Sequence, residues 1–226
     1  VNTNTLRVSL SWIYRILLHL PEGATRDELH LLLPDEDLDV FFNQHNPPDE
    51  GLYPIRGVVL FGLAEMERAR RFAAEMKAGR IEELGRLMNI SHDGDRVISI
   101  AADGSERPYR APTSNDYIRS LIDDLESGNL DRARRAQLQG QPGSYHCSLP
   151  EIDRMVHISR QTKGVVGAQL AGAGLGGCMM VLAHRDAVSN LVPNLTQHYY
   201  QPHAKAQTIL VCRPVAGCDV LMRNAW

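Results

Sequence analysis

The sequence has few cysteines, little excess charge of either sign and no long apolar run. Its 226 residues include four cysteines, none of them in a Cys-x-x-Cys pair: Cys147, Cys178, Cys212 and Cys218. We therefore expect reduced thiols in a cytoplasmic protein rather than a disulfide framework or a zinc site. The net charge of -3 gives no support to a nucleic-acid or membrane surface. No run approaches the roughly 18 apolar residues of a membrane helix, so we expect no membrane partner.

The composition is that of a globular chain, with 43% hydrophobic and 23% charged residues. Helical periodicity dominates residues 1–150, and Thr25 with Glu28 forms a predicted capping box. Residues 151–226 differ, because two apolar runs at 164–171 and 177–183 have strand character. With helical segments before and after them and a closing strand from residue 206, this part reads helix-strand-strand-helix-strand. The predicted fold class is α+β, a helical layer packed on a small antiparallel sheet.

A glycine-rich stretch, GAQLAGAGLGGCMM, joins the two predicted strands and contains Gly-x-Gly-x-x-Gly at Gly172, Gly174 and Gly177. A dinucleotide loop requires a strand before the glycines and a helix after them, and here a strand follows. A Walker loop is excluded because no Gly-Lys-Ser/Thr is present. The stretch is therefore predicted to be a turn between antiparallel strands. Its glycines serve either a tight hairpin alone or the close approach of a phosphate.

Two polar clusters have simple explanations. The run at His92, Asp93 and Asp95 contains the Asp-x-Asp of some metal sites, but it more often marks a turn after a helix, which we expect here. The basic run at Arg132, Arg134 and Arg135 is expected to form a solvated helix face. We expect no metal site in this chain.

The glycine stretch resembles the third motif of the GHMP small-molecule kinases, and its galactokinase version most closely. Galactokinases read Gly-(Ala/Ser)-(Arg/Lys)-Met-Thr-Gly-(Ala/Gly)-Gly-Phe-Gly-Gly-Cys there, and Cys178 after the double glycine matches. The stretches LGRLMNISH (84–92), CSLPEID (147–153) and VVLFGLAEMERA (58–69) resemble three further galactokinase segments in the same order.

The resemblance implies the C-terminal half of a longer kinase, with a ferredoxin-like αββαβ core over residues 151–226 and a mostly helical part over 1–150. It places six residues beside the phosphate or substrate: Gly172, Ala173, Gly174, Leu175, Gly176 and Gly177. The family's Ser-rich ATP loop and catalytic aspartate are not found here, so no catalytic residue is expected in this chain. ATP and Mg²⁺ would bind with the missing N-terminal domain, and the chain alone would be inactive. Its expected partners are that domain, a sugar and ATP, with a homodimer possible for the isolated piece.

Two departures lie inside the motif. Gln169 replaces the family's basic residue, and Ala171 replaces its Thr or Ser. They leave two hypotheses open. The full protein is a sugar kinase, acting on the anomeric hydroxyl of a hexose or on another family substrate such as fucose, arabinose or a heptose phosphate. Alternatively, it is a degenerate relative that binds sugar or nucleotide without turnover. Residues 93–141 also exceed what galactokinases place between these motifs, which predicts a lid, an interface or an addition to the helical layer.

Overall fold

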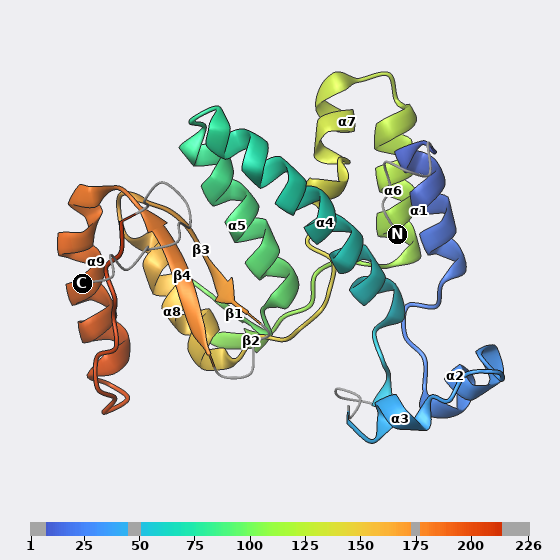
Figure 1. The fold of residues 1–226 in the computed structure, drawn as a ribbon, viewed down its shortest axis with the longest axis horizontal. Helices are drawn as coiled ribbons and strands as arrows, with labels where there is room; N and C mark the ends of the chain where they lie inside the picture. Colours follow the sequence, from blue (N-terminus) through green and yellow to red (C-terminus); the bar gives the residue numbers. More distant parts are fainter. Residues whose placement is uncertain (1–7, 45–50, 173–176, 214–226) are drawn as a thin grey trace, which may run out of the picture.

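The computed structural model describes residues 8–44, 51–172 and 177–213. The first half is helical, as predicted, and Figure 1 shows its helices arranged around the long α4. These elements are α1 (Leu10–His19), α2 (Arg26–Leu32), α3 (Asp39–Phe42), α4 (Ile55–Lys77) and α5 (Ile81–Asp95). The predicted capping box is confirmed, because the Thr25 hydroxyl accepts from the Glu28 amide and the Glu28 carboxylate accepts from the Thr25 amide.

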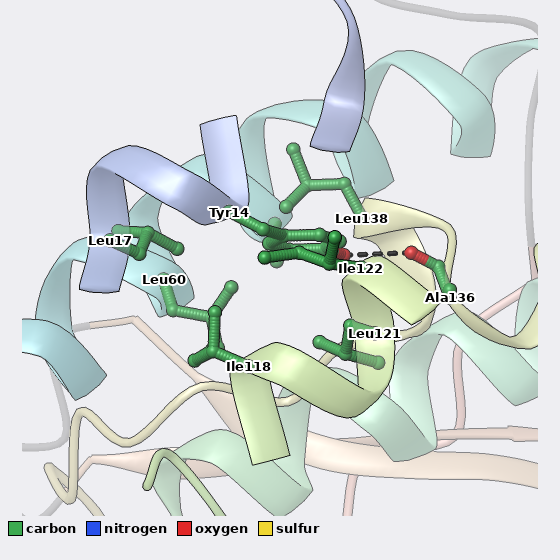
Figure 2. Close-up of a cluster of buried hydrophobic side chains, with 9 residues drawn as sticks. Tyr14, Leu17, Leu60, Ile118, Leu121, Ile122, Ala136 and Leu138 are labelled. Atoms are coloured by element: carbon green, nitrogen blue, oxygen red, sulfur yellow. Dashed lines mark hydrogen bonds between the residues drawn. The ribbon is translucent and has the colours of Figure 1, made fainter. Parts of the chain in front are cut away.

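Residues 93–141 add to the helical layer. They hold the short hairpin of β1 (Ile98–Ile100) and β2 (Glu106–Pro108), then α6 (Asn115–Glu126) and α7 (Leu130–Arg135). Helix α6 packs along α1, as Figure 1 shows. Figure 2 shows the core that joins them to α4, where the buried Tyr14 hydroxyl donates to the carbonyl oxygen of Ala136 at 2.8 Å.

The second half is built on an antiparallel hairpin of β3 (Val165–Ala171) and β4 (Cys178–Ala183). Helix α8 (Pro150–Gln161) packs on one face, where Ile152 and Val156 meet Ala168 and Leu170. Helix α9 (Val188–Leu195) follows β4, and α5 runs along β3 (Figure 1). The α+β class is therefore confirmed, with a helical layer and two small antiparallel sheets.

The predicted closing strand is not formed over residues 206–213, which carry no strand pairing. Residues 208–212 instead line one side of a cavity of about 250 Å³, whose other walls are β4, α9, Met155 of α8 and Tyr200. The remainder of the predicted strand, from residue 214, lies outside the described residues. The division between a helical part and an αββαβ part at residue 150 stays a prediction.

Candidate functional site

The predicted glycine turn stands at the end of the β3–β4 hairpin. Ala171 and Cys178 form the last pair of the ladder, and Gly172 follows with φ +78°, a conformation that glycine adopts readily. Among the described residues, no atom lies within 4 Å of the position that a Cβ would take on Gly172. Of the six predicted site residues, Gly172 and Gly177 flank the turn, while Ala173, Gly174, Leu175 and Gly176 lie outside the described residues. The predicted antiparallel pairing of the two strands is confirmed, and within the described part of the chain the space beside Gly172 is open.

Helix α5 holds the outer edge of β3 through side chains one turn apart. The Asn89 side-chain oxygen accepts from the Ala168 amide at 3.0 Å, and Nδ1 of His92 accepts from the Leu170 amide at 3.2 Å. The helix comes this close because a glycine stands on each element, at Gly85 and Gly167. The two acceptors satisfy amides that an edge strand would otherwise leave unpaired. The strand that leads into the glycine turn is thereby fixed in position.

His92 joins this edge to helix α8. Its side chain is 1% exposed, and its Nε2 lies 3.3 Å from Oδ1 of Asp153. Since Nδ1 accepts a hydrogen bond from an amide, the proton of the neutral ring sits on Nε2, facing the carboxylate. The arrangement is a buried bridge from α5 to α8 that also contacts β3.

The Asp153 carboxylate accepts hydrogen bonds at both of its oxygens. The Ser148 hydroxyl donates to Oδ1 at 2.6 Å, and the amides of Val97 and Ile98 donate to Oδ2 at 2.8 and 2.9 Å. Burial acts to raise the pKa of Asp153, but these three bonds and the adjacent His92 side chain outweigh it and lower the pKa below its ordinary value. The group is therefore a charged structural anchor at the start of α8.

A second buried pair lies beside the first. The Cys147 thiol donates to Oδ1 of Asp95 at 3.2 Å. Burial raises the pKa of Asp95 to about 6, and burial with the nearby carboxylate raises the pKa of Cys147 to about 12. The thiol therefore stays protonated at neutral pH and is a poor nucleophile.

The predicted turn at residues 92–95 was wrong. These residues form the last turn of α5, and His92 and Asp95 are buried there. Gly94 allows this because the carbonyl oxygen of Pro142 packs directly against it. Sequence reasoning thus missed the contact between His92 and Asp153. The available signal was that both residues fall in stretches with family resemblance, LGRLMNISH and CSLPEID.

The two motif departures lie on the face of the hairpin opposite α8. Ala168 and Leu170 point to α8, so by strand alternation Gln169 and Ala171 point away from it. Gln169 pairs across the ladder with Met180, which is 52% exposed. A basic residue at position 169 would therefore stand on this open face, close to the glycine turn.

Metal-ligating side chains do not cluster in the described part of the chain. Within residues 8–44, 51–172 and 177–213, no group of three or more His, Cys, Asp or Glu side chains is arranged to hold a metal ion. No described helix has the length and apolar character needed to cross a membrane. Cys147, Cys178 and Cys212 are free thiols, and Cys218 lies outside the described range.

Comparison with known proteins points to a kinase family. The family model described as GHMP kinases C terminal matches residues 121–201. The chain is 30% identical over 183 residues to a galactokinase of Roseiflexus sp. (strain RS-1), covering 81% of this chain and 34% of that protein. It is 28% identical over 174 residues to a galactokinase of Streptococcus suis (strain 05ZYH33), covering 72% and 44%. The chain thus spans between a third and a half of the length of these relatives.

Proposed function

Since the chain carries the C-terminal domain of the GHMP kinases and is related to galactokinases, we propose that it is the C-terminal half of a sugar kinase. The complete protein transfers the γ-phosphate of ATP to a sugar hydroxyl, the anomeric hydroxyl of a hexose such as galactose. We place this activity in the cytoplasm. The observation that carries the proposal is the fixed hairpin: His92, which faces Asp153, holds β3 one residue before its last ladder pair, and among the described residues the space beside Gly172 is open.

The chemistry explains what such a turn contributes. Phosphoryl transfer depends on positioning and on compensating charge that spreads over the transferred oxygens. A glycine turn offers backbone amides to these oxygens without a side chain in the way. In this proposal Gly172 to Gly177 line the cleft beside the phosphate or sugar, and α5 with α8 holds β3, the strand that leads into the turn. In this proposal the chain positions the reacting groups and contributes no catalytic base.

The remaining parts of the reaction belong to an N-terminal domain. In the proposal that domain brings the ATP loop and the aspartate that accepts the proton of the sugar hydroxyl. The described residues of this chain do not fit a Mg²⁺ site, so Mg²⁺ would enter with ATP on the other domain. The isolated chain is accordingly expected to be inactive. Its exposed apolar side chains on α2 and α3, among them Leu31, Leu32 and Phe41, support a need for cover by that domain or by a second copy.

A second function has its own supporting observation. Gln169 and Ala171 stand on the open face beside the glycine turn, and they lack the positive charge and the hydroxyl of the resembling motif. A protein with these losses could bind a sugar or nucleotide and not turn it over, acting as a sensor or regulator. A substrate other than galactose, such as fucose, arabinose or a heptose phosphate, would likewise require different side chains on the same face.

The test couples ADP release to a panel of sugars with MgATP, using the full-length reading frame, this chain alone, and the full-length Ala171→Thr variant. Turnover of one sugar by the full-length protein, with none by the chain alone, is the expected result. Sugar or nucleotide binding seen by thermal shift without turnover would favour the binding protein. Absence of both binding and turnover would reject both functions.

A further inference from the structure

An arginine-lined cavity lies on the helical layer, at the opposite end of α5 from His92. Its volume is about 620 Å³, and α4, α5 and α7 form its walls. Four arginines from these three helices line it, together with Glu83 as the single acidic lining residue: Arg71, Arg86, Arg134 and Arg135. Apolar surface from Leu130 and Ala133 and the amides of Gln137 and Gln139 complete the lining. We refer to it as the α7 cavity.

Helix stability alone does not explain why four arginines gather at the α7 cavity. Arg134 and Arg135 lie in the last turn of α7, where cations favour the helix dipole. That reason does not extend to Arg71, in the middle of α4, or to Arg86, in the second turn of α5. Cations from separate helices repel one another, so their convergence on one cavity is unfavourable unless an anion offsets it.

The carboxylates nearby leave much of this charge available. Arg71 contacts Glu67 at 3.0 Å, Arg86 contacts Glu83 at 2.6 Å, and these arginines remain 42% and 47% exposed. The partner carboxylates are less exposed, at 12% for Glu67 and 35% for Glu83. Ion pairs at a protein surface typically contribute about 0–1 kcal/mol, and an arginine keeps further donors after pairing with one carboxylate. Arg134 lies 3.5 Å from Asp131, and both side chains are largely exposed, at 78% and 79%. Arg135 is exposed and has no ion pair within the described part of the chain. By contrast Arg132, from the same basic run, turns away to Asp124 at 2.7 Å.

We propose that the α7 cavity binds a phosphate-bearing small molecule. Guanidinium groups match phosphate oxygens in pairs, which favours phosphate over a single carboxylate. The volume lies in the range of small-molecule sites, roughly 300–1,000 Å³, and the apolar wall at Leu130 and Ala133 suits the non-ionic body of a nucleotide or sugar phosphate. Helix α7 belongs to residues 93–141, so this additional segment completes the binding site.

This site is separate from the glycine turn. Arg86 and His92 stand six residues apart on α5, which corresponds to about 9 Å along the helix axis. Strand β3 runs along α5 from Gly85 to His92, so its glycine end is the end far from Arg86. Binding at the α7 cavity therefore does not depend on the proposed kinase function. It can succeed where sugar turnover fails, and it can fail where turnover succeeds.

The test is isothermal titration of the 226-residue chain with inorganic pyrophosphate, adenosine 5′-diphosphate and glucose 1-phosphate at near-physiological salt. The variants are Arg135→Gln and Arg86→Gln. The matched control is Arg119→Gln, an exposed arginine on α6 that pairs with Asp116 and lies outside the cavity.

The expected result is saturable binding of at least one probe, weakened tenfold or more by Arg135→Gln and by Arg86→Gln and unchanged by Arg119→Gln. Preference for the diphosphate or for the sugar phosphate would identify the body of the ligand. The proposal is overturned if none of the probes binds saturably at millimolar concentration. It is equally overturned if binding survives both cavity variants unchanged or weakens to the same degree in Arg119→Gln.

Discussion

Replacing His92 tests how the end of β3 that leads into the glycine turn is held. His92 accepts from the Leu170 amide through Nδ1 and faces Asp153 through Nε2, and its side chain is fully buried. His92→Leu removes both contacts while keeping an apolar group of similar size. His92→Asn keeps an acceptor near the Nδ1 position, and His92→Gln keeps a donor near the Nε2 position. The three variants therefore separate the contact to β3 from the contact to α8.

The magnitude follows from what is left unpaired. Without an acceptor, the buried Leu170 amide costs about 1–3 kcal/mol, and Asp153 loses a charge-assisted contact of about 1.5–3 kcal/mol. Asp153 keeps three other donors, so it stays charged and the lower part of each range applies. We expect His92→Leu to lower the free energy of unfolding by about 3 kcal/mol, and each of the other two variants by about half of that.

The assay is urea denaturation of each variant, with hydrogen exchange of the Leu170 amide measured alongside. Leu170 should lose protection in His92→Leu and His92→Gln and keep it in His92→Asn. His184→Leu is the control, because that histidine is exposed and its contact with Glu82 is 3.6 Å, so its effect should stay within about 0.5 kcal/mol. A His92→Leu variant with the control's stability and an unchanged Leu170 exchange rate would refute the account of this anchor.

Three further predictions concern packing and charge. Gly85→Val should destabilise the protein by about 3 kcal/mol or more, because a Cβ there collides with the Val166 carbonyl. Gly62→Ala, on the open side of α4, should instead be neutral or stabilise the protein by up to about 1 kcal/mol. Thermal unfolding of both variants tests this difference. Asp95→Asn should remove a pH dependence. Burial raises the pKa of Asp95 to about 6, so the folded protein binds this proton more tightly than the unfolded chain does. The contribution of Asp95 to stability is therefore fully present below about pH 4 and is lost as pH rises through 6. The free energy of unfolding of Asp95→Asn should therefore exceed that of the parent by up to about 3 kcal/mol above pH 6 and by nothing near pH 4. Urea denaturation across that pH range measures this difference. A difference that stays constant with pH would contradict the raised pKa of Asp95. Tyr14→Phe leaves the buried carbonyl oxygen of Ala136 without its donor and should lower the free energy of unfolding by about 1–2 kcal/mol in the same assay. An unchanged denaturation midpoint would mean that this bond does not help hold residues 93–141 to the helical layer.

The features that the sequence predicts correctly depend on local signals. The capping box at Thr25 and Glu28 needs only residues three apart, and the hairpin needs only two apolar runs around a glycine turn. The end of α5 was not predictable in this way, because Asp and Gly at residues 93–95 favour a turn locally. Packing of Gly94 against Pro142, and of Asp95 against Cys147, extends the helix, and these partners lie about 50 residues further along the chain.

The candidate site shows the same limit. The resemblance selected the stretches around His92, Asp153 and Leu170, but no local pattern indicates that they meet. His92 and Leu170 are 78 residues apart, and their contact depends on Gly85 and Gly167 letting α5 approach β3. The arginines of the α7 cavity likewise come from three helices, so the basic run at residues 132–135 predicted only a solvated face.

The most direct test of the central claim is the sugar-kinase activity of the full-length protein carrying Gly172→Val, compared with Gly128→Val. Both glycines have positive φ, +78° and +70°, and no described residue places an atom within 4 Å of either Cβ position, so the backbone strain is matched. The account predicts that kcat/KM falls at least about 100-fold for Gly172→Val, the scale of losing a transition-state contact, while Gly128→Val keeps parental activity. Equal activity of the two variants would contradict a role for the glycine turn in phosphoryl transfer.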